Sequence, residues 1–169
     1  MNNGTFVIPK KQVPVTLWVH PEGRVQGAMF VRMSETDAMP GEQPSDVINE
    51  VADFVVIERE DPNELRFYNK SSIVRVHYQE QAPAPPHQGQ RQPCRITMMD
   101  GSLIEAEIWK VTPAERSRLY DLMNDTSERF LKLRTGRAEV LLINKSYVVY
   151  ISEIEVCEQS AYTVATEAA

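Results

Sequence analysis

The sequence predicts a mainly β protein with short helices (α+β), built as two tandem small β-barrel units that each run β-β-α-β-β-β. Three observations predict this fold class. Asn69-Lys70-Ser71 returns 75 residues later as Asn144-Lys145-Ser146, and at the same offset Asp46-Val47-Ile48-Asn49 returns as Asp121-Leu122-Met123-Asn124. Two motifs that recur in the same order indicate an internal duplication. Apolar residues alternate with polar ones around both motifs, and five short strands that bury one face commonly curl into a small barrel.

The duplication divides the chain into five segments. We expect an N-terminal tail over residues 1–12, barrel unit 1 over 13–78, a Pro/Gln-rich linker over 79–93, barrel unit 2 over 94–157 and a C-terminal tail over 158–169. Prolines in the linker favour an extended spacer. Each unit is near the smallest size that folds alone, so we expect the units to pack together or to oligomerise.

The first unit is predicted to open with a β-hairpin. Apolar residues alternate over 13–19, and an extended pattern resumes over 24–31 after a break at His20-Pro21-Glu22-Gly23. Ser45 is expected to cap a short helix with an apolar face. Three further strands are predicted over residues 54–57, 65–68 and 73–78.

The second unit repeats this plan. Asp100-Gly101 separates strand patterns at 95–99 and 102–109, and Asp-Gly favours a tight hairpin because a type I′ turn needs positive φ. Thr112-Pro113-Ala114-Glu115 is predicted to start a helix with a capping threonine and a capping-box glutamate. The remaining strands are predicted over 130–133, 139–143 and 147–153, with Phe130 matching Phe54 if one residue is inserted.

These patterns resemble the Sm/LSm-like (SH3-like) small β-barrel family. Residues 98–104 are similar to that family's first motif, 121–124 to its Asp-x-x-Met-Asn segment, and 142–148 lie where its second motif is expected. The resemblance covers about half of the chain and implies a small barrel in each unit. The family usually has Arg-Gly where this chain has Asn-Lys-Ser, and its helix usually precedes the barrel, so its RNA binding is not carried over. The duplicated pattern also resembles bacterial proteins of unknown function.

The candidate binding residues are those of the two Asn-Lys-Ser turns: Asn69, Lys70, Ser71, Asn144, Lys145 and Ser146. One interpretation is a pair of equivalent contacts for a ligand or partner, each with an ammonium and two hydrogen-bonding side chains. The other interpretation is turn chemistry, because Asn tolerates left-handed backbone and Ser hydrogen-bonds its own backbone.

The Asp-x-x-Asn pairs also have two interpretations. At one-turn helical spacing, Asp46 with Asn49 and Asp121 with Asn124 supply two oxygens each, short of the six to eight that a calcium ion needs. Alternatively, the asparagines end the helices. The three histidines share no metal-ligand spacing. We therefore predict no catalytic residue, no metal site and no cofactor.

Composition narrows the partners and the compartment. The formal net charge of −6 opposes binding to phosphate backbones unless a local basic patch overrides it. No apolar run approaches the ~18 residues of a membrane span, and no secretory signal is recognisable. Cys94 and Cys157 do not make a disulfide framework, and we expect them to be reduced and close together. We expect a cytoplasmic protein without membrane contact.

The sequence thus predicts a non-enzymatic cytoplasmic adaptor or assembly module that acts through protein–protein contacts with an unknown protein partner. Self-association into a homo-oligomer is also expected, because exposed edge strands invite the addition of another strand. The alternative is an Sm-like RNA- or nucleotide-binding regulator, for which Trp18 and Trp109 could stack bases. Clustering of Lys70, Lys145, Arg75 and Arg95 on one surface would favour that alternative.

Overall fold

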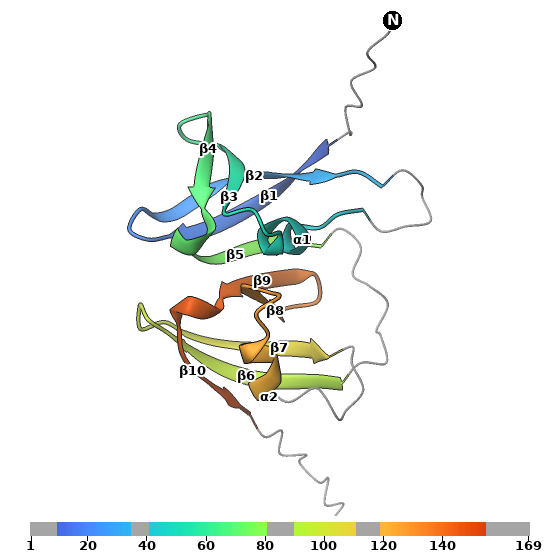
Figure 1. Cartoon of the computed structure of the whole chain (residues 1–169), viewed down its shortest axis with the longest axis vertical. Coiled ribbons are helices and arrows are strands. Elements are labelled where there is room, and N and C mark those ends of the chain that lie inside the picture. The colour runs from blue at the N-terminus through green and yellow to red at the C-terminus, as the bar shows by residue number, and fades with distance from the viewer. Residues whose placement is uncertain (1–9, 35–40, 81–89, 111–118, 155–169) are drawn as a thin grey trace, which may run out of the picture.

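The computed structural model describes residues 10–34, 41–80, 90–110 and 119–154 (Figure 1). Within these ranges ten strands form one antiparallel sheet in the order β10-β6-β7-β8-β9-β5-β1-β2-β3-β4. The strands are β1 Lys10–Val19, β2 Gly23–Arg32, β3 Phe54–Arg59, β4 Glu64–Asn69, β5 Ile73–Gln79, β6 Gln90–Met98, β7 Leu103–Lys110, β8 Phe130–Arg134, β9 Glu139–Asn144 and β10 Val148–Glu153. The helical elements are α1 Pro44–Asn49, α2 Leu119–Asn124 and the 3-10 turns η1 Lys70–Ser72 and η3 Lys145–Tyr147.

The predicted grouping of these strands into two tandem barrels is wrong. The ten strands form one open sheet, with β4 and β10 as its edges, rather than closed barrels. Strand β5 pairs with β9 from Arg75↔Ile143 to Gln79↔Glu139, so residues 13–78 and 94–157 are not two separate β-β-α-β-β-β units. Figure 1 shows the two halves stacked with β5 against β9. Joining two strand edges satisfies backbone groups that separate units would leave unpaired at this point.

The individual strands lie close to where the alternation predicts them, although β1 begins at Lys10 in the predicted tail and β6 at Gln90 in the predicted linker. Both predicted hairpin pairings are present, but Asp100 lacks the positive φ that a type I′ turn needs. Strands β1 and β2 pair from Lys10↔Arg32 to Val19↔Gly23, and Gly23 takes the positive φ of 94° that the turn requires. Gly101 has a φ of 81° in the predicted Asp-Gly turn between β6 and β7. Strands β2 and β3 approach closely at Gly27, where a Cβ atom would lie 2.3 Å from the Glu58 carbonyl oxygen.

The first helix differs from the prediction at its start. Helix α1 begins at Pro44, so Ser45 lies in its first turn and Gln43 is the N-cap residue. The Asp46 carboxylate accepts a hydrogen bond from the Gln43 amide at 2.8 Å, which places a negative charge at the positive end of the helix. The predicted helix start at 112–115 lies outside the described residues.

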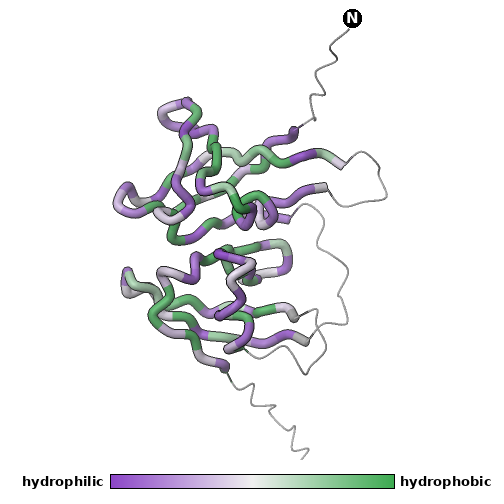
Figure 2. The backbone as a smooth tube through the Cα atoms, viewed as in Figure 1, coloured by the Kyte–Doolittle hydropathy of each residue, from purple (hydrophilic) through white to green (hydrophobic). Residues whose placement is uncertain are grey.

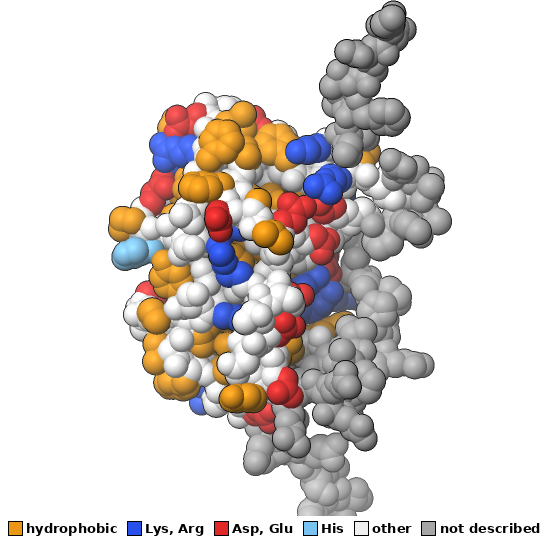
Figure 3. Space-filling model, viewed as in Figure 1, with side chains coloured by type: hydrophobic (Ala, Val, Ile, Leu, Met, Phe, Trp, Pro, Cys, Tyr) orange, Lys and Arg blue, Asp and Glu red, His pale blue; other side chains and the backbone are white. Residues whose placement is uncertain are grey.

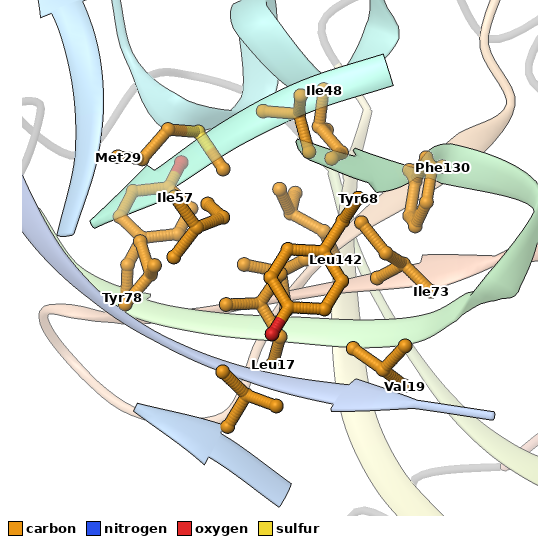
Figure 4. Packing of buried hydrophobic residues seen from close by; sticks show 14 of the residues in the cluster. Leu17, Val19, Met29, Ile48, Ile57, Tyr68, Ile73, Tyr78, Phe130 and Leu142 are labelled. Carbon is orange, nitrogen blue, oxygen red and sulfur yellow. The ribbon is translucent and has the colours of Figure 1, made fainter. Parts of the chain in front are cut away.

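Two apolar clusters form the core, and each contains residues from both halves. Figure 2 shows hydrophobic stretches along the strands of both halves. The first cluster consists mainly of residues of the first half, and Phe130, Val140 and Leu142 of the second half complete it. Figure 4 shows Phe130 and Leu142 among residues of the first half such as Ile73. The second cluster includes Val74 of the first half. Because each half buries apolar side chains of the other, the described strands fold as one body.

Candidate functional site

The two Asn-Lys-Ser segments have the same local structure. Each asparagine precedes a 3-10 turn and accepts a hydrogen bond on its side-chain oxygen: Asn69 from the Ser71 amide at 2.8 Å, and Asn144 from the Ser146 amide at 3.0 Å. Neither asparagine has positive φ, so the predicted left-handed conformation is absent there. The turn chemistry is asparagine capping of a 3-10 turn.

The two lysines of these segments bind the ends of the α-helices. Lys70 donates from Nζ to the Val47 and Glu50 carbonyls, each at 2.9 Å. Lys145 donates to the equivalent carbonyls of Leu122 and Asp125 at 2.8 and 2.9 Å. The Val47 carbonyl also accepts a 3.3 Å bond from the Glu50 amide, so the ammonium of Lys70 is an additional, charged donor at this helix end. In both halves the positive charge matches the negative end of the helix dipole. Burial lowers the pKa of both lysines.

These contacts give the predicted binding residues a structural role. Lys70 is 2% exposed and Asn144 is fully buried, so a ligand has little access to either side chain. Asn144 also donates from Nδ2 to the Lys70 and Ile73 carbonyls at 3.3 and 2.9 Å, which ties the second half to the first. That the segments contact a ligand or partner stays a prediction.

The Asp-x-x-Asn pairs do not converge on a common site. Asn49 forms a two-point contact with the backbone of Phe130, donating to its carbonyl at 3.1 Å and accepting from its amide at 2.8 Å. Asn124, the equivalent residue of the second half, is exposed and donates to the Tyr120 carbonyl at 2.8 Å. Among the described residues no group of three or more His, Cys, Asp and Glu side chains is arranged to hold a metal ion.

An ion cluster around the Glu80 carboxylate links the two halves at the end of the β5–β9 pairing. Glu80 follows β5 and contacts Lys132 at 2.7 Å and Arg134 at 2.6 Å, both on β8 of the second half. Burial on its own would raise the pKa of Glu80, but the hydrogen bonds and charges of Lys132 and Arg134 outweigh it and hold the pKa below its usual value. The Glu80 amide also donates to the Ala138 carbonyl at 2.9 Å.

Strand β4, at one edge of the sheet, carries an exposed apolar row that it shares with the start of β3. Phe54, Leu65 and Phe67 are 57, 58 and 70% exposed. Figure 3 shows apolar side chains on the surface over the region of β4. A contiguous exposed apolar surface on an edge strand is typical of an interaction site. We call Phe54, Leu65 and Phe67 the β4 row.

The β4 row has a buried equivalent in the second half. Phe54 pairs with Asn69 as Phe130 pairs with Asn144, and β9 repeats β4 at the 75-residue offset. The equivalents of the row are therefore Phe130, Val140 and Leu142, which are all fully buried in the first core cluster. The same relation holds at the opposite edge, where Val149 of β10 is 59% exposed and its equivalent Val74 of β5 is 9% exposed.

The basic and aromatic residues that the sequence singled out for a nucleic-acid surface have partners within the protein. Arg75 lies over the ring of Trp18 at 4.3 Å, and Arg91 and Arg134 lie over the ring of Trp109 at 4.7 and 4.5 Å. Arg95 donates to Glu105 at 2.6 Å. Lys70 and Lys145 bind the helix ends, so none of these side chains presents an unengaged basic group.

Cys94 is fully buried, and its thiol donates to the Ala106 carbonyl with an Sγ–O distance of 3.4 Å. Burial raises the pKa of this thiol to about 11. Cys157 lies outside the described residues, so the predicted proximity of the two cysteines stays a prediction.

We expect Cys94 to be inert in the folded protein. In a Cys157→Ser variant at pH 8, the remaining thiol should fail to react with a colorimetric thiol reagent until denaturant is added, because at this pKa only about 0.1% of it is thiolate and it is also shielded from solvent. Rapid labelling of the native variant would contradict this expectation.

No family model, curated protein or solved structure matches this chain. These comparisons leave the resemblance to Sm/LSm-like barrels untested. In the described part of the chain, no helix is both long and apolar enough to cross a membrane.

The sequence interpretation missed the junction and the β4 row. One signal was present in the sequence, because Phe54 and Phe130 were matched across the duplication, and the alternation of Leu65 and Phe67 repeats that of Val140 and Leu142. The sequence does not indicate which copy of the pattern is buried.

Proposed function

We infer that this protein is a non-enzymatic cytoplasmic assembly module that binds other proteins through the open edges of its sheet. The observation that carries this proposal is the β4 row, three exposed apolar side chains whose equivalents are buried where the halves join. An edge strand offers unpaired backbone groups for strand addition, and alternate apolar side chains supply specificity. Cys94 is buried and forms no disulfide among the described residues, which is compatible with a cytoplasmic location.

The alternative of an Sm-like RNA- or nucleotide-binding regulator has less support. Clustering of four cations on one surface would support this alternative: Lys70, Lys145, Arg75 and Arg95. Two of these cations bind helix carbonyls, one stacks on tryptophan and one pairs with a glutamate. The net charge of −6 further opposes contact with phosphates.

Site-specific photo-crosslinking in the native cell tests the assembly proposal. A benzophenone amino acid at Phe67, on the β4 edge, should give adducts heavier than the 19.3 kDa chain that contain a second protein chain. The same group at Leu103 is a matched control, because Leu103 is also well exposed but lies on β7, which is paired on both sides. Absence of adducts at Phe67, or equal adducts at both positions, would contradict the proposal.

A further inference from the structure

The two strands at the open edges of the sheet are the equivalents of the two strands that pair where the halves of the chain join. Each half has the same strand order, β5-β1-β2-β3-β4 in the first and β10-β6-β7-β8-β9 in the second. The halves join where β9, fourth strand of the second half, pairs with β5, fifth strand of the first. The free edges are the remaining fourth strand, β4, and the remaining fifth strand, β10.

Resting on the function proposed above, we propose that the partner of these edges is a second copy of this chain, added head to tail. Strand β4 of one copy pairs with β10 of the next and repeats the contact of β9 with β5. Such a contact is heterologous, because two different surfaces meet, and each addition leaves a free edge of each kind at the ends.

The apolar residues of the two edges match the sides of the internal junction. Inside the chain, Phe130, Val140 and Leu142 enter the core of the first half, and Val74 of β5 enters the core of the second. In the joined copies, the β4 row occupies the position of the first group and Val149 that of Val74. All of these residues are apolar, although in the single chain the edge set is exposed.

The two asparagines that join the halves have equivalents at the edges, Asn124 and Asn69, whose side chains form local hydrogen bonds: Asn124 donates to the Tyr120 carbonyl and Asn69 accepts from the Ser71 amide. Asn49 binds the Phe130 backbone, and the exposed Asn124 is placed to bind the Phe54 backbone of the next copy in the same way. Asn144 donates to two carbonyls of the first half, and Asn69 is its exposed equivalent on β4.

The internal junction predicts the register between copies. Val76 pairs with Leu142 and His77 with Leu141 inside the chain. The 75-residue offset converts these pairs to Ile151 with Phe67 and Ser152 with Arg66. Strands β5 and β10 also share an irregularity: the pairing of each with its inner neighbour shifts next to the equivalent residues Val74 and Val149.

One feature of the internal junction is not repeated, and it makes the contact between copies weaker. Glu80 binds Lys132 and Arg134 inside the chain, whereas the equivalent positions on β3 are Val56 and Glu58. These two positions of β3 therefore offer no pair of cations to bind a carboxylate of the next copy. We therefore expect association that is reversible and depends on concentration.

Sedimentation and light scattering of the purified full chain test this proposal. The mass of the wild-type protein should rise above 19.3 kDa with increasing concentration. Phe67→Lys blocks the β4 edge and Val149→Lys blocks the β10 edge, so each variant alone should stay at the mass of one chain. An equimolar mixture should reach twice that mass and no more, because only one unblocked β4 and β10 pair remains per complex.

Leu103→Lys is the matched control, since it places the same charge at an exposed leucine inside the sheet and should associate like the wild type. Circular dichroism should show that every variant is folded. Association of Phe67→Lys alone, association of Val149→Lys alone, or a mixture that does not form dimers would each overturn head-to-tail joining.

The outcome is separable from the proposed function. A wild-type chain that stays at 19.3 kDa at high micromolar concentration overturns the second-copy proposal. Crosslinks from Phe67 to a different protein would overturn it as well, while leaving the assembly module supported. A chain that neither self-associates nor crosslinks through the β4 edge contradicts both.

Discussion

Replacing Lys70 with methionine is expected to lower the free energy of unfolding by about 3 kcal/mol. Methionine keeps the length of the unbranched side chain but removes the ammonium that binds the Val47 and Glu50 carbonyls at 2.9 Å. Lys70 is almost fully buried, so water does not readily replace the lost donor. The Val47 carbonyl keeps its 3.3 Å bond from the Glu50 amide, so the main losses are the Glu50 contact and the charge at the helix end. A hydrogen bond to a charged group contributes about 1.5–3 kcal/mol. Urea denaturation at neutral pH measures the change.

The equivalent substitution Lys145→Met is the internal control. Lys145 makes the same two contacts, with the Leu122 and Asp125 carbonyls, but it is partly exposed. Water can reach these carbonyls after the substitution, so the expected loss is about 1 kcal/mol. Equal losses for the two variants, or a loss below about 0.5 kcal/mol for Lys70→Met, would contradict a burial-dependent helix cap.

The sequence predicted the Asn-Lys-Ser turns but not that their lysines bind the ends of the helices. The repeat of Asn-Lys-Ser identified two equivalent turns, and turn chemistry explains the asparagine and serine. The lysine acts on the end of a helix 20 to 23 residues earlier in the chain, at Val47 and Glu50. A lysine in a polar turn looks like a solvated charge, and only the packing of η1 under the end of α1 makes it a buried donor.

For the fold, too, the sequence predicted the local elements but not the contacts between distant parts of the chain. Alternation predicted the strands because side-chain direction in a strand has period two. It did not predict the pairing of β5 with β9, because alternation does not depend on whether a strand edge is free or paired. Val140 and Leu142 repeat the pattern of Leu65 and Phe67, yet one pair is buried and the other exposed. Edge pairing depends on long-range geometry, so the prediction of two closed barrels failed.

Replacing Glu80 with glutamine tests the junction between the halves, and we expect it to lower the free energy of unfolding by about 2–3 kcal/mol at neutral pH. Removing one partner of a buried ion pair typically costs 3–5 kcal/mol because the other charge stays buried without compensation. Glu80 and Arg134 are 9 and 10% exposed at their side chains, but Lys132 is 39% exposed. Water can solvate Lys132, so the expected loss is below the usual range.

The stability difference between the wild type and Glu80→Gln should also depend on pH and should become smaller as pH falls, because the ion cluster lowers the pKa of Glu80. Lys132 and Arg134 hold the pKa of the folded Glu80 below its ordinary value of 4.5. A carboxyl whose pKa is lower in the folded state contributes stability above the unfolded pKa and loses it as pH falls through the folded pKa. The difference between wild type and variant should therefore be full at pH 7 and shrink below about pH 4.5. Denaturant titrations at pH 7 and near pH 3 measure both values.

Glu105→Gln is the control for the Glu80 experiment. Glu105 pairs with Arg95 on the surface, where both side chains are about half exposed, and such pairs contribute at most about 1 kcal/mol. If Glu80→Gln changed stability no more than Glu105→Gln, or by the same amount at both pH values, the ion cluster would not be what holds the halves together. The β5–β9 backbone pairing and the apolar residues at the junction would then account for the single sheet. The contact proposed between copies, which lacks such a cluster, would then be expected to rival the internal junction in strength.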